Sequence, residues 1–147
     1  MSEEKHNTVD LYTDGGSRGN PGPAGIGYVI KNKNGKIIEK NGKFIGKATN
    51  NEAEYQALIA GLKAAKKYTP KKLNCFSDSA LVVNQLNGEF KVKKAHLKKL
   101  VFEVQSKLAE MLGTTVKFQH IPREENSEAD ALLNEALDNK EKENSNH

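Results

Sequence analysis

The sequence has one cysteine, no tryptophan and no long run of apolar residues. The single cysteine, Cys75, excludes an internal disulfide and fits a reducing compartment, so we expect a cytoplasmic location. No stretch approaches the roughly 20 apolar residues that a membrane-spanning helix needs, and residues 1–7 lack the apolar core of a signal peptide. We therefore expect no association with a membrane.

Arginine is also scarce, since only Arg18 and Arg123 occur among the 23 basic residues. The net charge of +4 and the isoelectric point near 9.0 suit a polyanionic partner, although many basic proteins bind no nucleic acid. Arginine is the better bidentate partner for phosphate or carboxylate. Its restriction to two loop motifs therefore hints at a role in those loops.

The length of 147 residues fits one domain with a single core. We expect a folded domain over residues 8–138, a flexible N-terminus over residues 1–7 and a disordered polar tail over residues 139–147. Nothing in the sequence requires a dimer, so a monomer is the default expectation.

Hydrophobic periodicity predicts an α/β fold in which strands come first and helices alternate with strands later. Strands are expected at residues 8–14, 25–30, 36–45, 73–77 and 114–121, and helices at residues 51–68, 79–86, 93–112 and 127–137. Asn34-Gly35 is a strong hairpin signal, and Thr49 to Glu52 has the pattern of a capping box. The result is a mixed five-stranded sheet, an antiparallel meander followed by parallel strands, covered by helices.

Two helices carry an acid where an apolar side chain is expected. Glu54 precedes Leu58 and Leu62 by four and eight residues, and so shares the core-facing stripe of its helix. Asp130 precedes Leu133 by three residues, which places its carboxylate on the apolar side of the closing helix. Both helices therefore point an acid at the sheet.

Asp14 and Asp78 each end a predicted strand, and ligands of open α/β sheets gather at such ends. Four converging carboxylates repel one another, and a hard divalent cation relieves that repulsion. Oxygen-only ligands favour Mg²⁺ or Mn²⁺ over zinc. Two such ions about 4 Å apart are able to support phosphodiester hydrolysis, which predicts a nuclease.

Each acid also has a purely structural interpretation. Asp14 followed by glycine fits a turn, and Asp78 fits the cap of the next helix. Asp130 fits a capping box with Ser127, and Glu54 fits a weaker one with Asn51. Four independent structural acids would have no reason to meet at one sheet edge, so we favour the metal site.

Four segments resemble the acidic motifs of the type 1 ribonucleases H, in the same order, over about residues 8–137. They are Tyr12-Thr13-Asp14-Gly15-Gly16-Ser17 followed by Gly19-Asn20-Pro21-Gly22, then Thr49-Asn50-Asn51-Glu52-Ala53-Glu54, Ser77-Asp78-Ser79, and Asn126-Ser127-Glu128-Ala129-Asp130. The resemblance implies a ribonuclease H-like fold and an endonuclease that cuts the RNA strand of RNA–DNA hybrids, leaving 5′-phosphate and 3′-hydroxyl ends. It also implies two Mg²⁺ or Mn²⁺ ions held by Asp14, Glu54, Asp78 and Asp130, with Glu52 as a helix cap.

The resemblance extends to residues around the acids. A histidine before the last acid is thought to assist proton transfer or product release in the family, and His120 looks like its counterpart. His120 equally fits a histidine that only ends a strand. Arg123 is similar to an arginine of one bacterial and archaeal branch, so the resemblance makes Arg123 a candidate to share or replace the role of His120. The implied substrate contacts, which also fit simple turn and cap formers, are Gly15, Gly16, Ser17, Asn20, Thr49, Asn50 and Asn51.

The chain departs from the best-known members between Asp78 and His120, where it is too short for a separate basic protrusion. The residues that would partly replace it, or simply form a solvated face, are Phe90, Lys91, Lys93, Lys94, Lys98 and Lys99. Two other functions stay open: a catalytically silent nucleic-acid-binding module, and a nuclease that also cuts double-stranded RNA.

Overall fold

The computed structural model describes residues 6–88 and 91–145, which form five strands, four α-helices and one 3-10 turn. In chain order the elements are β1 (Thr8–Ser17), β2 (Gly22–Asn32), β3 (Ile37–Ala48), α1 (Asn50–Lys66), β4 (Lys72–Ser77), α2 (Ala80–Leu86), α3 (Ala95–Ala109), β5 (Thr115–His120), the 3-10 turn η1 (Arg123–Asn126) and α4 (Ser127–Ser145). The predictions for residues 1–5, for Phe90 and for residues 146–147 lie outside the described residues.

The strands form one sheet in the order β3-β2-β1-β4-β5. The first three pair antiparallel, whereas β4 runs parallel to both β1 and β5. The predicted mixed five-stranded sheet, a meander followed by parallel strands, is therefore confirmed.

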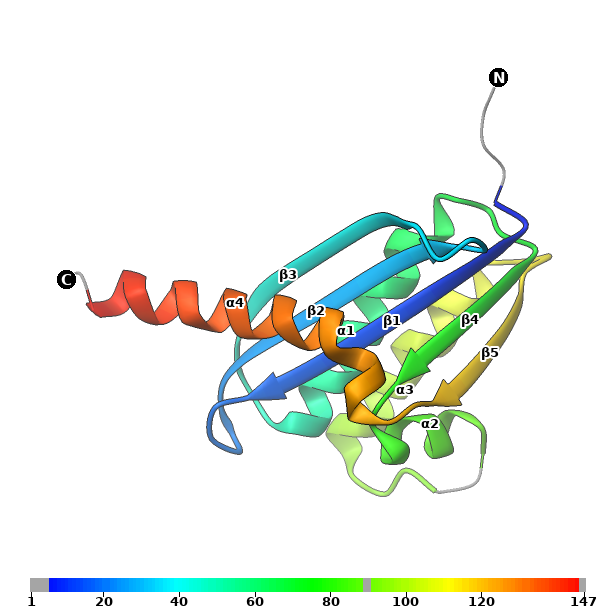
Figure 1. Cartoon of the computed structure of the whole chain (residues 1–147). Helices are drawn as coiled ribbons and strands as arrows, with labels where there is room; N and C mark the ends of the chain where they lie inside the picture. Colours follow the sequence, from blue (N-terminus) through cyan, green and yellow to red (C-terminus); the bar gives the residue numbers. More distant parts are fainter. Residues whose placement is uncertain (1–5, 89–90, 146–147) are drawn as a thin grey trace.

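Helices cover both faces of the sheet (Figure 1). On one face α1 packs on β1 and β2, with α3 beside it, and α4 crosses β1, β2 and β3 on the other face. The larger core lies on the α1 side, where Val9 and Leu11 of β1 meet Leu58 and Leu62 of α1. Burial of these side chains fixes the position of α1 over the central strand, and with it the position of the acid on α1.

The start of α1 follows the predicted capping box. The Thr49 amide donates to the Glu52 carboxylate at 2.8 Å, and the Glu52 amide donates to the Thr49 hydroxyl at 3.1 Å. Two backbone donors that a helix start leaves unsatisfied are thereby paired. Glu52 is thus occupied as a cap, and Glu54 is left free to face the sheet.

β1 is longer than predicted. The sequence places its end at Asp14, but pairing with β2 continues through Gly15 and Gly16 to Ser17. Glycine has weak intrinsic preference for a strand, yet β2 supplies a complete ladder of backbone partners opposite these residues. Tertiary pairing therefore overrides the local turn signal, and Asp14 lies within the strand rather than at its end.

The closing helix is also longer than predicted, and the expected disordered tail over residues 139–147 is wrong as far as Ser145. The Arg18 guanidinium lies 2.8 Å from the Asp138 carboxylate and 2.9 Å from that of Glu141. Arg18 thus contacts the part of α4 that the sequence analysis assigned to a tail, where Lys140 and Glu143 also form an i,i+3 ion pair. Within residues 6–88 and 91–145, no helix has the length and apolar character needed to cross a membrane.

Candidate active site

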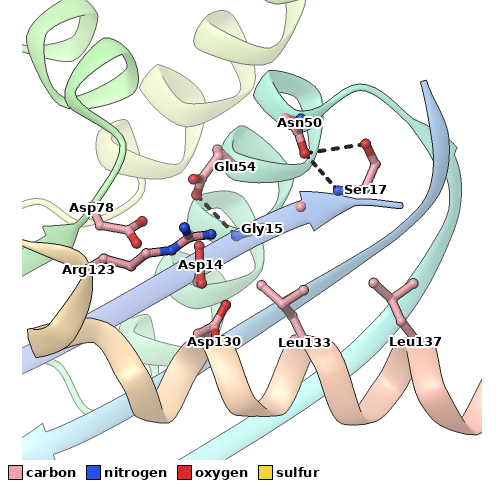
Figure 2. Close-up of a pocket in the computed structure, with 11 residues that line it drawn as sticks. Asp14, Gly15, Ser17, Asn50, Glu54, Asp78, Arg123, Asp130, Leu133 and Leu137 are labelled. Carbon is pink, nitrogen blue, oxygen red and sulfur yellow. Dashed lines mark hydrogen bonds between the residues drawn. The ribbon is translucent and has the colours of Figure 1, made fainter. Parts of the chain in front are cut away.

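A pocket of about 430 Å³ opens where β1, α1 and α4 meet (Figure 2). Its lining is mostly acidic and polar, with two leucines of α4 along one side. The lining residues are Asp14, Gly15, Gly16, Ser17, Asn50, Glu54, Asp78, Arg123, Asp130, Leu133 and Leu137. All four predicted acids therefore line the same pocket.

Asp14 owes its position to the sheet register. The parallel pairing of β1 with β4 ends at Thr13 opposite Ser77, so Asp14 is the first residue of β1 beyond it. On the other side β2 still pairs Asp14 with Gly27. Asp14 is only 5% exposed, so its carboxylate sits where the parallel half of the sheet ends.

Glu54 reaches the pocket because α1 approaches β1 very closely at Gly15. The Gly15 amide donates to a Glu54 carboxylate oxygen at 3.1 Å. A Cβ atom on Gly15 would lie 2.1 Å from the Ala53 carbonyl oxygen, which only glycine avoids. The glycine therefore holds the second acid beside the first.

Asp78 comes directly after β4, next to the end of the parallel pairing. The alternative interpretation of Asp78 was that it caps α2. The Ser79 side chain caps α2 instead, by accepting from the Val82 amide. Carboxylate oxygens of Asp14, Glu54 and Asp78 all lie within 4.8 Å of one another. Asp78 is thus free to act with the other two acids.

Asp130 enters from the opposite side, in the first turn of α4. Figure 2 shows its carboxylate directed toward Asp14, and the two side chains are close enough to hydrogen-bond. α4 continues directly from η1. The two helices predicted to point acids at the sheet do so from its two faces.

The electrostatics of the cluster are unfavourable without a cation. Burial, together with the negative charges of Glu54 and Asp78, raises the pKa of Asp14 to about 9. Burial and the charge of Asp78 raise the pKa of Glu54 to about 8, although the Gly15 amide and Arg123 act in the opposite direction. At neutral pH these carboxyl groups favour protonation. Oxygen donors crowded in this way fit Mg²⁺ or Mn²⁺.

The two candidates for proton transfer or product release have different places. Arg123, in η1, lines the pocket, and Figure 2 shows its side chain extending between Asp78 and Asp14. His120 ends β5 opposite Ser77, and it is exposed and does not belong to the pocket lining. The structure thus brings Arg123, but not His120, into the acidic cluster.

Comparison with known proteins agrees with this geometry. A sequence profile of the reverse transcriptase-like family matches residues 12–136. Ribonuclease HI of Halobacterium salinarum is 40% identical, over 94% of this chain and 68% of the relative. The chain belongs to the type 1 ribonuclease H family.

Another relative shows that such a domain also occurs in longer proteins. A bifunctional protein of Mycobacterium tuberculosis is 41% identical over 88% of this chain, which spans only 35% of that protein. Among solved structures, LC11-RNase H1 in complex with an RNA/DNA hybrid has a TM-score of 0.85 and 41% identity, covering 90% of this chain and 98% of that one. The ribonuclease H fold thus accounts for nearly the whole chain.

The residues predicted to touch substrate divide into two groups. Gly15, Gly16, Ser17 and Asn50 line the pocket, whereas Asn20, Thr49 and Asn51 do not. A Cβ atom on Gly16 would meet nothing closer than 3.8 Å, so the protein itself does not require glycine at that position.

The second group supports the first. The Asn50 amide donates to the Asn20 side chain at 3.0 Å, and the Asn50 side-chain oxygen accepts from the Ser17 amide at 2.9 Å. Asn20 and Asn50 therefore join the β1–β2 loop to the start of α1.

The lysines expected on an exposed face, Lys91, Lys93, Lys94, Lys98 and Lys99, are all exposed.

Asn126 is a residue of this ribonuclease H site that the sequence reasoning missed. Its side chain is 1% exposed, and its Nδ2 donates to the Thr13 carbonyl at 2.9 Å. Its Oδ1 has no hydrogen-bond partner among the described residues. The bond joins η1 to β1 beside Asp14 and so sets the position of Arg123. The only signal in the sequence is that Asn126 opens the last acidic motif.

Proposed function

We propose that this chain is an endoribonuclease that hydrolyses the RNA strand of RNA–DNA hybrids. The observation that carries the proposal is the cluster of Asp14, Glu54 and Asp78, with ligand oxygens within 4.8 Å and Asp130 against it. The relative seen with an RNA/DNA hybrid supports the substrate class. We expect attack of water on phosphorus and cleavage of the bond to the 3′ oxygen, leaving 5′-phosphate and 3′-hydroxyl ends.

The four carboxylates would hold two Mg²⁺ or Mn²⁺ ions. The fit rests on an oxygen-only donor set and on the raised pKa values of Asp14 and Glu54, which are caused by burial and by the charges of the neighbouring carboxylates. When bound, such ions supply a more acidic water and neutralise charge on the leaving oxygen. The chain contributes rigidity, because the acids come from β1, α1, α4 and the end of β4, and not from one mobile loop.

Arg123 is the candidate for stabilising negative charge on the phosphate or assisting product release. Its guanidinium carries a fixed positive charge beside the acids. His120 stays a weaker candidate, which would need to approach from the edge of the pocket.

Hybrid recognition would come from the rim formed by Gly16, Ser17 and Asn50. The open space at Gly16 allows close approach of a sugar edge, and the neutral donors beside it position a backbone without reading sequence. The 2′-hydroxyl is the chemical difference by which the RNA strand is recognised. A cytoplasmic location and a monomeric state remain predictions.

The test is cleavage of one labelled sequence as RNA–DNA hybrid, double-stranded RNA and double-stranded DNA, each with Mg²⁺, Mn²⁺ or a chelator. Cutting restricted to the RNA of the hybrid and dependent on metal is the expected result.

Asp14→Asn should abolish cleavage but retain hybrid binding. Asp10→Asn is the matched control, since Asp10 lies on the same strand and accepts from Asn74, outside the pocket. A near-normal rate for Asp14→Asn would remove that residue from the site.

Two other outcomes identify the alternatives. Binding without cleavage under every metal condition would make the chain a silent nucleic-acid-binding module. Metal-dependent cutting of double-stranded RNA at a comparable rate would instead mean that the site does not require a DNA strand.

A further inference from the structure

Arg18 makes a concentrated set of contacts outside the acidic cluster. Its Nη1 lies 2.8 Å from Asp138 and 2.9 Å from Glu141, and its Nη2 donates to the Asn134 side chain at 3.2 Å. These three acceptors are four and three residues apart, so they share one face of α4. One guanidinium therefore spans nearly two turns of the helix.

The loop that carries Arg18 also carries a predicted substrate contact. Asn20, two residues on, accepts from the Asn50 amide, and Asn50 in turn accepts from the Ser17 amide just before Arg18. The loop is also closed on itself, because the Arg18 amide donates to the Pro23 carbonyl at 2.8 Å. Any shift of Arg18 therefore displaces the polar rim of the pocket.

We propose that Arg18 is a positioning residue for hybrid binding, which holds the β1–β2 loop between the far half of α4 and the start of α1. The inference rests on the proposed function. Asp138 and Glu141 are 61% exposed and Arg18 is 34% exposed, so these ion pairs contribute little to global stability. Their effect falls on the position of the rim, and hence on affinity for the hybrid rather than on the chemical step.

A competing role for Arg18 is direct contact with a phosphate, and the two roles have opposite consequences when its acidic partners are removed. Asp138→Asn combined with Glu141→Gln leaves Arg18 in place and frees its charge. A positioning role predicts that the KM for the hybrid rises about 3-fold to 10-fold, with kcat within about 2-fold of the wild type. A direct phosphate contact predicts that the KM stays the same or falls. Arg18→Lys keeps the charge without the bidentate fork, and should resemble the double variant.

The matched control is Glu143→Gln, which breaks the exposed pair with Lys140 on the same helix without touching the loop. Amide hydrogen exchange of residues 17–22, followed without substrate, gives a readout independent of activity. Faster exchange there in the double variant, but not in the control, together with the rise in KM is the expected result. Unchanged exchange, or an unchanged or lower KM, would overturn the inference. If the wild type cuts no hybrid, the proposed function fails, and faster exchange together with weaker hybrid binding in chelator would still support the positioning role.

Discussion

Replacing the buried Asp14 by a neutral asparagine should stabilise the metal-free protein against unfolding. Asp14 is 5% exposed, and burial plus the charges of Glu54 and Asp78 raise its pKa from 3.8 to about 9. The folded state therefore keeps a proton that the unfolded state has lost between those pH values. Because the folded state binds more protons, the free energy of unfolding falls as pH rises from about 4 to about 9.

The size of the effect follows from the pH interval. The unfolded-state pKa of 3.8 lies about 3 units below pH 7. At about 1.4 kcal/mol per unit, the buried Asp14 lowers the free energy of unfolding at pH 7 by up to about 4 kcal/mol. Asp14→Asn removes this loss of stability, because the amide has nearly the same shape as the carboxyl group and carries no charge at any of these pH values. We expect the variant to be more stable than the wild type by about 1–4 kcal/mol at pH 7, and the difference to disappear near pH 4.

Urea denaturation at pH 4, 7 and 8.5 measures the difference, with chelator or with Mg²⁺. Added Mg²⁺ should stabilise the wild type, whose carboxylates are ligands, and should stabilise Asp14→Asn much less. Glu103→Gln, at an exposed position on α3, is the control and should leave the free energy of unfolding unchanged. An Asn variant less stable than the wild type at pH 7, or equal stabilisation of both by Mg²⁺, would refute the reasoning.

Gly15→Ala should lower the free energy of unfolding by at least about 2 kcal/mol, because its Cβ collides with a backbone carbonyl of α1. Gly16→Ala should keep the stability within about 0.5 kcal/mol but raise the KM for the hybrid, and a normal KM would show that substrate does not use that space. Asn126→Ala should cost about 1–2 kcal/mol by leaving a buried carbonyl unpaired, and should lower kcat more than any stability-matched surface variant. Arg123→Ala should reduce kcat at least about 10-fold, and His120→Ala should slow turnover less; the reverse order in cleavage assays would assign the role to the histidine.

The convergence of the acids was predictable because it depends on local periodicity. The spacing of Glu54 and Asp130 from the leucines of their helices fixes the side of each helix that carries them, and both helices do pack on the sheet by those sides. The change from antiparallel to parallel pairing in the sheet followed from the hairpin signal and from the later alternation of helices and strands. The periodicity of a helix sets which of its faces is buried, so these predictions needed no knowledge of the strands that pack against it.

The errors arose where distant residues decide the outcome. β1 continues to Ser17 because β2 pairs with it. α4 continues to Ser145, and its end contacts Arg18 through Asp138 and Glu141. Asn126 looks like any polar loop residue until the strand carbonyl that it meets is known. The sequence did single out Arg18 as unusual, but its partners lie about 120 residues away and carry no local signal.

The position of α4 illustrates how such distant contacts set the active site. Glycines on β2 and β3 leave room for the helix: a Cβ atom on Gly27 would lie 2.2 Å from the Ala129 carbonyl, and one on Gly42 would lie 2.4 Å from the Leu132 carbonyl. Side chains at either position would hold α4 away from the sheet. Asp130 directly follows Ala129, so the same displacement would withdraw the fourth carboxylate from Asp14. The glycines of the meander, which in sequence suggest only turns and weak strands, therefore determine whether the acid set is complete.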